Sequence, residues 1–573
     1  MTLWSTNEKA RFVVKKLKIL TLHKLLVAEN YVFLYNLFFQ NILMGGGGKK
    51  MKFVKADILP QVGLGNTVYL MKSSWNDWYY WETKYLLLYS DNRGRYNTIG
   101  EVKIGQDRMK PESECVSSEE KISYCKPIVD DVSEGFSDDY FSLGQTENYY
   151  ETLNLLSPGV KKAILKGMRD VSYDLNIYRK FRTHPAMIHS VLREISERHI
   201  FDSLHNLAKG HENNNEFRFS YLFPFTDHED KEVRLSFGVV PNTMPPSNIH
   251  AIIGRNGVGK TTLFSGFIKG VIRNKALEDN YVGLLQVPND IGEWISKPEY
   301  FTSLTLLSYS PFDKFGPVDP SEIPSGLKYE YIGLMDRVNG KLIPKSFDTL
   351  HQDFCESMRE CLVGARRKRW KDCLLILEND PLFKEIEISN LAELIIDDTA
   401  QDWSDKVRGF LNKFSSGHLV TLISITKLIE VTEDRSLTLI DELEAHLHPP
   451  LISAYIRAIS HLMSERNGVA IVATHSPVVL QEVRSDCAWI LNRTGKYVSA
   501  NRPQIETFGE NVGTLTREVF SHEVVNTGFY KMITDASETY SDFDALNKHF
   551  DEKLGGEARA LARSLIRIKK SES

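Results

Sequence analysis

The sequence predicts an α/β fold in which a sheet carries a phosphate-binding loop, and three apolar segments predict it. Residues 249–253 are largely β-branched and apolar, as in a buried parallel strand, and they lead into a glycine-rich loop and a helical pattern. Residues 437–440 form a second strand that ends in two carboxylates, and residues 469–473 form a third that ends in Thr474 and His475. Together the three segments predict a nucleotide-binding α/β domain.

The glycine-rich loop, residues 254–261, has the pattern G-x-x-x-x-G-K-T between a predicted strand and a predicted helix. Glycines let backbone N–H groups converge on phosphate oxygens, and the N-terminus of the next helix adds a favourable dipole. The pattern predicts that Lys260 reaches the β- and γ-phosphates and that Thr261 binds Mg²⁺. The predicted cofactors are ATP and Mg²⁺, and the loop residues expected to bind them are Asn256, Gly257, Gly259, Lys260, Thr261 and Thr262.

The other two strand ends supply candidate catalytic groups. Asp441 is expected to hold Mg²⁺, and Glu442 to polarise the attacking water. A lone histidine is more often structural, but His475 follows Asp441 by one predicted helix and one predicted strand. The place of His475 resembles that of the histidine with which ABC-class ATPases sense the γ-phosphate, and the resemblance implies the same role here.

A serine-rich segment precedes the apolar helix predicted at residues 419–429. Ser415, Ser416 and Gly417 form a candidate anion site at the start of that helix. By itself this pattern is typical of an ordinary helix cap. The segment lies about twenty residues before the strand of Asp441, a position that resembles the signature segment of ABC-class ATPases, and this resemblance implies a nucleotide-binding role.

The order of these four motifs resembles the ABC-ATPase superfamily, and residues 441–449 resemble the bacterial defence and repair branch that includes the OLD and SMC-like ATPases. The resemblance implies an ABC-ATPase head, a P-loop NTPase with a mixed sheet. It also implies a head-to-head homodimer in which Ser416 and Gly417 contact the γ-phosphate held by the other subunit. Two departures stand out, because His418 replaces the usual glutamine and residues 308–313 lack the expected glutamine of a Q-loop. His446 and His448 lack the further ligands that a metal site needs.

Residues 215–530 more narrowly resemble the PtuA ATPases of Septu antiphage systems, which also occur in retron-linked operons. The supporting segments are residues 245–248 and 507–520. This resemblance implies control of a partner HNH nuclease, and in some relatives an association with a reverse transcriptase and its RNA–DNA product. A transporter, an OLD nuclease and a long-armed SMC protein fit less well. A stand-alone DNA-repair ATPase and a nucleotide-gated scaffold with little hydrolysis remain alternatives.

The chain has 573 residues, and its pattern predicts several parts. Residues 1–50 form a basic extension with eight Lys/Arg against two Asp/Glu, and they end in GGGGKK before Met51, so Met51 is the predicted natural start. The other predicted parts are a β-hairpin and helical region at 51–214, an ATPase lobe at 215–342, a helical insertion at 343–413, the signature and strand motifs at 414–500, and a C-terminal segment at 501–573.

Charge and cysteine usage favour a cytoplasmic protein. The net charge of −5 gives no global basic field, and the six cysteines lack zinc-site spacing, so reduced thiols are expected. No segment is apolar enough to predict a membrane span. The one local basic cluster, Arg366, Arg367, Lys368 and Arg369, is interpreted first as a solvated helix face and second as a nucleic-acid contact.

Overall fold

The computed structural model describes residues 51–573 apart from short gaps, and residues 52–573 form one compact unit. The gaps are residues 74–76, 78–79, 212–215, 225–231, 274–282, 290, 298–299, 310–315, 325, 339, 395–399, 495–496, 525–527 and 573. The basic extension at 1–50, and with it the prediction that Met51 is the start, lies outside the described residues.

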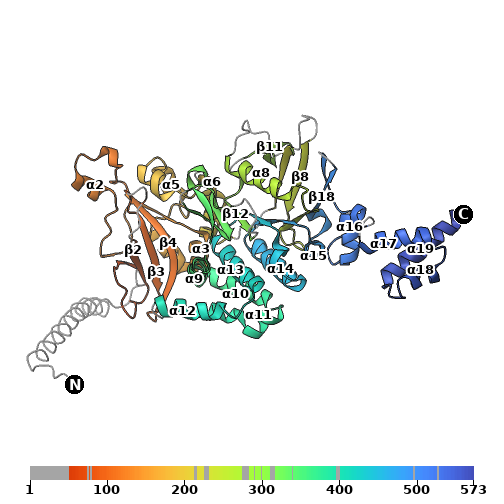
Figure 1. Ribbon diagram of the computed structural model, residues 1–573. Coiled ribbons are helices and arrows are strands. Elements are labelled where there is room, and N and C mark those ends of the chain that lie inside the picture. The colour runs from red at the N-terminus through yellow and green to blue at the C-terminus, as the bar shows by residue number, and fades with distance from the viewer. Residues whose placement is uncertain are drawn as a thin grey trace, which may run out of the picture. The chain divides into compact units, whose positions relative to one another are not determined.

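A seven-stranded sheet forms the centre of the unit (Figure 1). Its first six strands run parallel and the last runs antiparallel, so the predicted mixed α/β sheet is confirmed. The strands in spatial order are β13 (Lys328–Gly333), β12 (Ser303–Ser308), β16 (Ser436–Asp441), β17 (Val469–Thr474), β9 (Ile249–Ile253), β18 (Ala488–Thr494) and β19 (Tyr497–Asn501). Every residue of β9, β16 and β17 is buried, which explains their continuous apolar runs.

Alternate residues of these strands point into two different cores. Ile252 packs on one face, with helix α8 (Lys260–Arg273) and a four-stranded antiparallel sheet. The four strands are β7 (Phe217–Pro224), β8 (Glu232–Val239), β10 (Leu284–Pro288) and β11 (Trp294–Ser296). Ile253 packs on the other face, with helices α13 (Ser416–Val431) and α14 (Pro449–Glu465). The phosphate-loop strand is therefore fixed from both sides.

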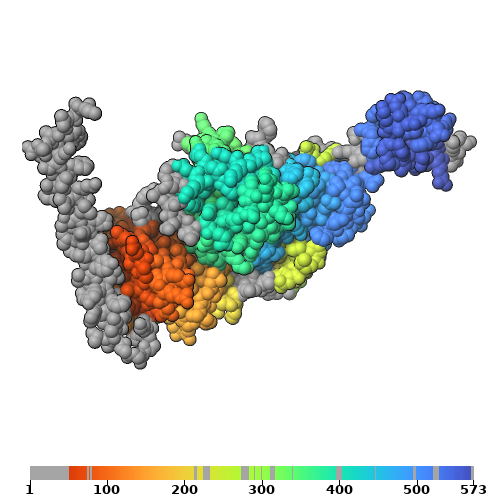
Figure 2. All heavy atoms as spheres, turned by 90° about the horizontal axis from the view of Figure 1, so that it is seen from below, coloured from red at the N-terminus to blue at the C-terminus, as the bar shows by residue number. Residues whose placement is uncertain are grey.

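The predicted helical insertion folds onto α13 and α14 rather than extending as an arm. It contains α9 (Phe347–Cys361), α10 (Ala365–Leu377), α11 (Pro381–Ile386), η6 (Ile388–Glu393) and α12 (Ala400–Leu411). Trp370 of α10 is fully buried, and its indole nitrogen donates to the hydroxyl of Thr426 on α13 at 3.1 Å. Figure 2 shows these helices, in green to cyan, as one continuous mass beside the orange N-terminal residues.

The N-terminal region contains a six-stranded sheet in the order β5-β1-β2-β3-β4-β6. Its strands are β1 (Lys52–Lys55), β2 (Thr67–Lys72), β3 (Lys84–Ser90), β4 (Tyr96–Gln106), β5 (Val132–Ser133) and β6 (Tyr140–Gly144). Strands β3 and β4 are the hairpin that the sequence predicts. The helices of this region are α2 (Ser118–Tyr124), α3 (Glu147–Asn154), α4 (Pro158–Gly167), α5 (Leu175–Phe181), α6 (Glu197–His199) and α7 (His205–Lys209), with η1 (Glu112–Glu114), η2 (Met187–Val191) and η3 (Ile200–Leu204).

Helix α3 joins the N-terminal region to the insertion. Its Asn148 side chain accepts from the N–H of Arg366 at 3.0 Å, and its Thr152 hydroxyl accepts from the N–H of Ala365 at 3.2 Å. These two side chains bind the first N–H groups of α10, which a helix cannot satisfy by itself. Gly364 at the cap has a φ of +64°, and a methyl group there would lie 2.0 Å from the Thr152 hydroxyl. Glycine is therefore required at this joint.

The C-terminal segment is helical. Its helices are α16 (Val512–Val524), α17 (Gly528–Thr539), α18 (Phe543–His549) and α19 (Gly556–Glu572). The remaining described elements, which lie before residue 501, are η5 (Pro320–Glu322), the hairpin of β14 (Met335–Val338) and β15 (Lys341–Pro344), η7 (Leu443–His446), α15 (Pro477–Gln481) and η8 (Ser485–Cys487). Ile533, Leu546 and Ala562 form a small core between α17, α18 and α19. All six cysteines are free thiols. In the described part of the chain, every helix is too short or too polar to cross a membrane.

Candidate functional site

The phosphate loop connects the carboxyl end of β9 to the N-terminus of α8. Gly257 and Gly259 have φ angles of +79° and +107°, which side-chain-bearing residues rarely adopt. A methyl group added at either position would meet no atom within 4 Å, so the loop backbone faces open space at both residues. Consecutive N–H groups around such glycines form an anion-binding concavity. The loop therefore fits the phosphates of a nucleotide.

Lys260 lies inside this loop with 5% of its surface exposed. Its ammonium donates to the carbonyl oxygens of Gly254 at 2.9 Å and Arg255 at 3.3 Å. Burial lowers the pKa of Lys260, and the carboxylates of Glu442, Glu444 and Asp441 oppose that shift. Of the three carboxylates, Glu442 has the largest electrostatic effect on the lysine. The cation and the candidate catalytic carboxylate therefore belong to one site.

Thr261 and Asp441 come together although 180 residues separate them. The Thr261 hydroxyl donates to the Asp441 carboxylate at 3.2 Å, and Asp441 is buried at the end of β16. Mg²⁺ prefers such oxygen ligands, and in proteins it typically takes one or two carboxylates together with phosphate oxygens and waters. The residues present therefore fit an ATP·Mg²⁺ complex.

Glu442 has an uncommon backbone conformation. Its φ of +48° places a residue with a full side chain in the left-handed region, and its N–H donates to the carbonyl oxygen of Ala473 at 3.1 Å. The bond joins the ends of β16 and β17. Strained residues held by their surroundings concentrate at functional sites, so the conformation favours a role for this half-buried carboxylate.

His475 follows β17 and is 43% exposed. One oxygen of Glu444 accepts from the His475 N–H at 2.6 Å, from the Thr474 hydroxyl at 2.6 Å, and lies 3.0 Å from the imidazole Nδ1. Glu444 therefore orients the ring and leaves Nε2 as the nitrogen that faces away from this contact. Sequence reasoning missed Glu444, although a third acidic residue in D-E-L-E was an available signal.

The serine-rich segment begins helix α13, with Ser415 as the cap and Ser416 as the first helical residue. Ser415 and Ser416 are exposed and Gly417 is buried. In the described part of the chain, the hydrogen bonds of these residues run within α13 and do not reach the phosphate loop. Ser415 and Ser416 therefore face solvent, and their segment is not hydrogen-bonded to the phosphate loop of the same chain.

His418 connects this segment to the insertion. Its Nδ1 lies 2.7 Å from the Ser415 hydroxyl, and its Nε2 lies 3.0 Å from a carboxylate oxygen of Asp380. The other oxygen of Asp380 lies 3.5 Å from Nε2 of His448. Asp380 is buried and also caps helix α11. One carboxylate of the insertion thus contacts residues next to two of the predicted nucleotide-binding segments.

The segment in which a Q-loop glutamine was expected, residues 308–313, lies partly outside the described residues. Ser308 ends β12 and pairs in register with Asp441, so the chain leaves the sheet beside the candidate magnesium ligand. Residues 310–315 lie in a gap of the description.

The basic cluster has mostly internal contacts. Arg366 and Arg369 are buried, and their guanidinium groups pair with Glu360 at 3.2 Å and Glu151 at 2.7 Å. The guanidinium of Arg367 donates to the carbonyl oxygens of Ala392 and Leu394. The side chain of Lys368, the remaining residue of the basic cluster, is 78% exposed. The solvated-face interpretation is therefore wrong for Arg366 and Arg369, because both side chains are buried and paired with carboxylates of the same chain. The nucleic-acid contact stays a prediction.

Comparisons with known proteins add to this geometry. Residues 370–481 match a family model described as "AAA domain, putative AbiEii toxin, Type IV TA system", a span that contains the serine-rich segment, Asp441 and His475. Among solved structures, the chain resembles the SMC head domain from Thermotoga maritima at 10% identity and a TM-score of 0.24, over 51% of this chain and 100% of that one. It resembles the ADP conformation of an ATP-binding cassette of an ABC transporter at 14% identity and a TM-score of 0.23, over 51% of this chain and 93% of that one.

A curated relative extends the similarity over most of the chain. Protein ea59 of Escherichia phage lambda is 34% identical over 522 residues, which cover 87% of this chain and 95% of that protein. The Asp441 strand lies within the matched family model, and Thr261 of the phosphate loop donates to Asp441. The chain belongs to the family of protein ea59 of Escherichia phage lambda.

Proposed function

We propose that the chain is a Mg²⁺-dependent ATPase whose two active sites form between the heads of a homodimer. One observation carries the proposal. Lys260, Thr261, Asp441 and Glu442 gather at one edge of the sheet. Ser415 and Ser416 of the same chain are exposed, and among the described residues the hydrogen bonds of their segment run within α13. A second head that supplies Ser415, Ser416 and Gly417 completes the site.

Each side chain then has a distinct task. The loop N–H groups and Lys260 bind the phosphates, while Thr261 and Asp441 hold Mg²⁺, which neutralises phosphate charge. Glu442 accepts a proton from the attacking water, and His475, oriented by Glu444, contacts the γ-phosphate. The exposed N-terminus of α13 in the other subunit supplies N–H groups and a favourable dipole.

Mixing two inactive variants tests whether the sites are composite. Lys260→Ala removes a phosphate ligand, and Ser416→Glu places a repelling carboxylate where the other subunit's γ-phosphate would lie. Acidic residues suit a helix N-terminus, so Ser416→Glu should leave α13 folded. Each variant alone is expected to lack ATPase activity. A 1:1 mixture of symmetric dimers that exchange subunits should regain about a quarter of the wild-type rate, since half the dimers carry one intact site.

The mixture distinguishes the alternatives directly. Phosphate release from the mixture at the level of the single variants would contradict the composite site. Full activity of Ser416→Glu alone would show that hydrolysis needs only one head. Light scattering of the wild type with and without ATP provides the matching measurement of dimer formation.

We further propose that this ATPase controls a partner HNH nuclease in an antiphage complex. The resemblance of residues 245–248 and 507–520 to the PtuA ATPases supports this proposal. Purification from the native host, with the chain tagged at its own locus, should bring down an HNH-nuclease chain, and in a retron-linked operon also a reverse transcriptase with its RNA–DNA product. Recovery of the homo-oligomer alone, with phage protection intact, would contradict this role and favour a stand-alone repair ATPase or a nucleotide-gated scaffold.

A further inference from the structure

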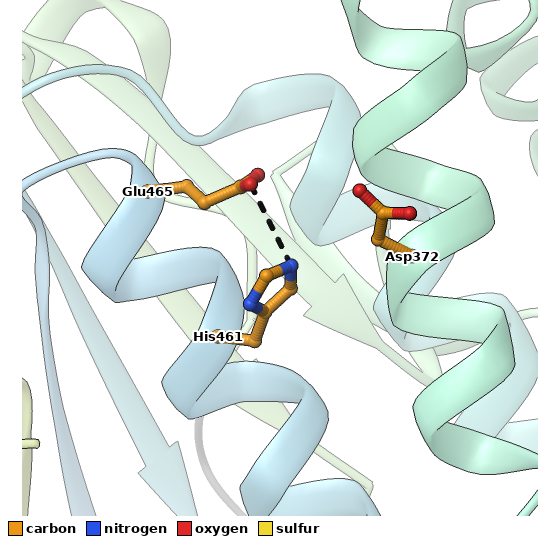
Figure 3. A group of neighbouring side chains, drawn as sticks. All are labelled: Asp372, His461 and Glu465. Atoms are coloured by element: carbon orange, nitrogen blue, oxygen red, sulfur yellow. Dashed lines mark ion pairs between the residues drawn. The ribbon is translucent and has the colours of Figure 1, made fainter.

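Three metal-ligating side chains converge outside the nucleotide site. Asp372 lies on α10 of the insertion, and His461 and Glu465 lie one turn apart on α14 of the ATPase core (Figure 3). The three side chains can each place one ligand atom within 4.8 Å of the others. The cluster therefore bridges two helices that belong to different parts of the fold.

The imidazole of His461 provides the second observation. Its Nε2 is shielded from solvent and makes no hydrogen bond among the described residues, although the side chain as a whole is 34% exposed. The nitrogen forms an ion-pair contact with the Glu465 carboxylate at 3.6 Å, which is beyond hydrogen-bond range (Figure 3). A shielded polar atom without a partner costs about 1–3 kcal/mol. A metal ion between His461 and Glu465 would satisfy it.

The spacing suits a tetrahedral ion. Zn²⁺ binds imidazole nitrogen and carboxylate oxygen at about 2.0–2.2 Å, so two ligands of a tetrahedral site lie about 3.4 Å apart. The distance from His461 Nε2 to Glu465 Oε1 is 3.6 Å. Little movement is needed to bring both atoms onto one ion, and Asp372 on the facing helix supplies the third ligand.

Neighbouring cations compete only weakly for the two carboxylates. Lys368 pairs with Asp372 at 3.1 Å, but the lysine is 78% exposed and can turn into solvent. Arg369 lies 3.7 Å from Glu465, and its shorter contact, at 2.7 Å, is with Glu151. Exposed pairs contribute about 0–1 kcal/mol, so a bound divalent ion displaces Lys368 at small cost.

We propose that Asp372, His461 and Glu465 bind a divalent transition metal, with Zn²⁺ as the preferred ion, and that the ion fastens the helical insertion to the ATPase core. One nitrogen and two carboxylate oxygens form a ligand set that Zn²⁺ accepts, with water in a fourth position. Glu465 also lines a cavity of about 820 Å³ with Arg369 and Arg466, so the site lies beside the joint between the insertion, the core and α3. This site is independent of ATP.

The test uses the full chain with Zn²⁺ alone and no nucleotide. Calorimetric titration of the wild type should show a Zn²⁺ site that His461→Ala and Asp372→Asn each weaken by about tenfold or more. Lys368→Met should strengthen the same site, because the competing ammonium is gone. His189→Ala, an exposed histidine on η2, and Asp441→Asn, at the nucleotide site, should leave it unchanged. Circular dichroism checks that each variant is folded.

Two results would overturn the proposal. Equal Zn²⁺ affinity in the wild type, His461→Ala and Asp372→Asn would place any bound zinc elsewhere. A weaker rather than stronger site in Lys368→Met would show that the ammonium supports the cluster instead of competing for it. Because no nucleotide is present, loss of the zinc site and loss of ATPase activity are separate outcomes.

Discussion

Glu442→Gln is expected to stop ATP turnover while leaving nucleotide binding intact. The amide keeps the size of the side chain but cannot accept a proton from the attacking water, and removing a general base typically lowers the rate by about 10²–10⁴-fold. Lys260, Thr261 and Asp441 keep their contacts, so ATP and Mg²⁺ still bind. Phosphate release and nucleotide binding, measured on the same preparation, check both halves of the prediction. With turnover stopped, the ATP-bound dimer should accumulate and be visible by light scattering.

The matched control is Glu385→Gln, an exposed glutamate on α11, which should keep wild-type turnover. A Glu442→Gln protein that hydrolyses ATP within about twofold of the wild type would assign the water to another group. A variant that no longer binds nucleotide would instead give Glu442 a structural role, through its electrostatic effect on Lys260.

Arg466→Ala should cause the largest loss of stability. Arg466 ends α14 with 5% of its side chain exposed, and its guanidinium contacts Glu147 and Glu151 of α3. Burial lowers the pKa of Arg466 to about 10, but the group stays charged at neutral pH. Removing one partner of a buried ion pair leaves an uncompensated charge and costs about 3–5 kcal/mol. The guanidinium-chloride midpoint should fall accordingly.

The control is Arg484→Ala, whose partner Asp486 is 62% exposed, and its cost should stay below about 1 kcal/mol. A second variant isolates the charge effect. Glu147→Gln added to Arg466→Ala removes the carboxylate that has lost its partner and should recover part of the loss. Equal midpoints for Arg466→Ala and Arg484→Ala would mean that the α3 joint does not hold the fold together.

The strand and loop of the candidate phosphate site could be predicted from the sequence because their signals are local. The β-branched residues at 249–253 favour a strand, and the glycines at 257 and 259 allow the positive φ angles of the loop. Both preferences can be recognised from a few neighbouring residues. The pairing of Thr261 with Asp441 follows once both segments are placed at the same end of one sheet.

The contacts that join the helical insertion to α3 and to the ATPase core could not be predicted in this way. Arg369 lies in a run of four cations that is typical of a solvated surface, yet its guanidinium is buried against Glu151, 218 residues away. Asp380 likewise meets His418 across 38 residues, and its local sequence indicates only a helix cap. Such contacts depend on how the insertion packs, which local patterns do not encode.

If the heads dimerise as proposed, the carboxylate of Asp380 couples the insertion to the dimer interface. It contacts His418, beside the segment that meets the other subunit's nucleotide in the proposed dimer, and His448, after the Asp441 strand. A molecule that binds the insertion and shifts α11 changes the free energy of dimer closure. By reciprocity, ATP-driven closure changes the affinity of the insertion for that molecule by the same factor. The insertion therefore provides a place where a second chain can sense, or set, the nucleotide state of the heads.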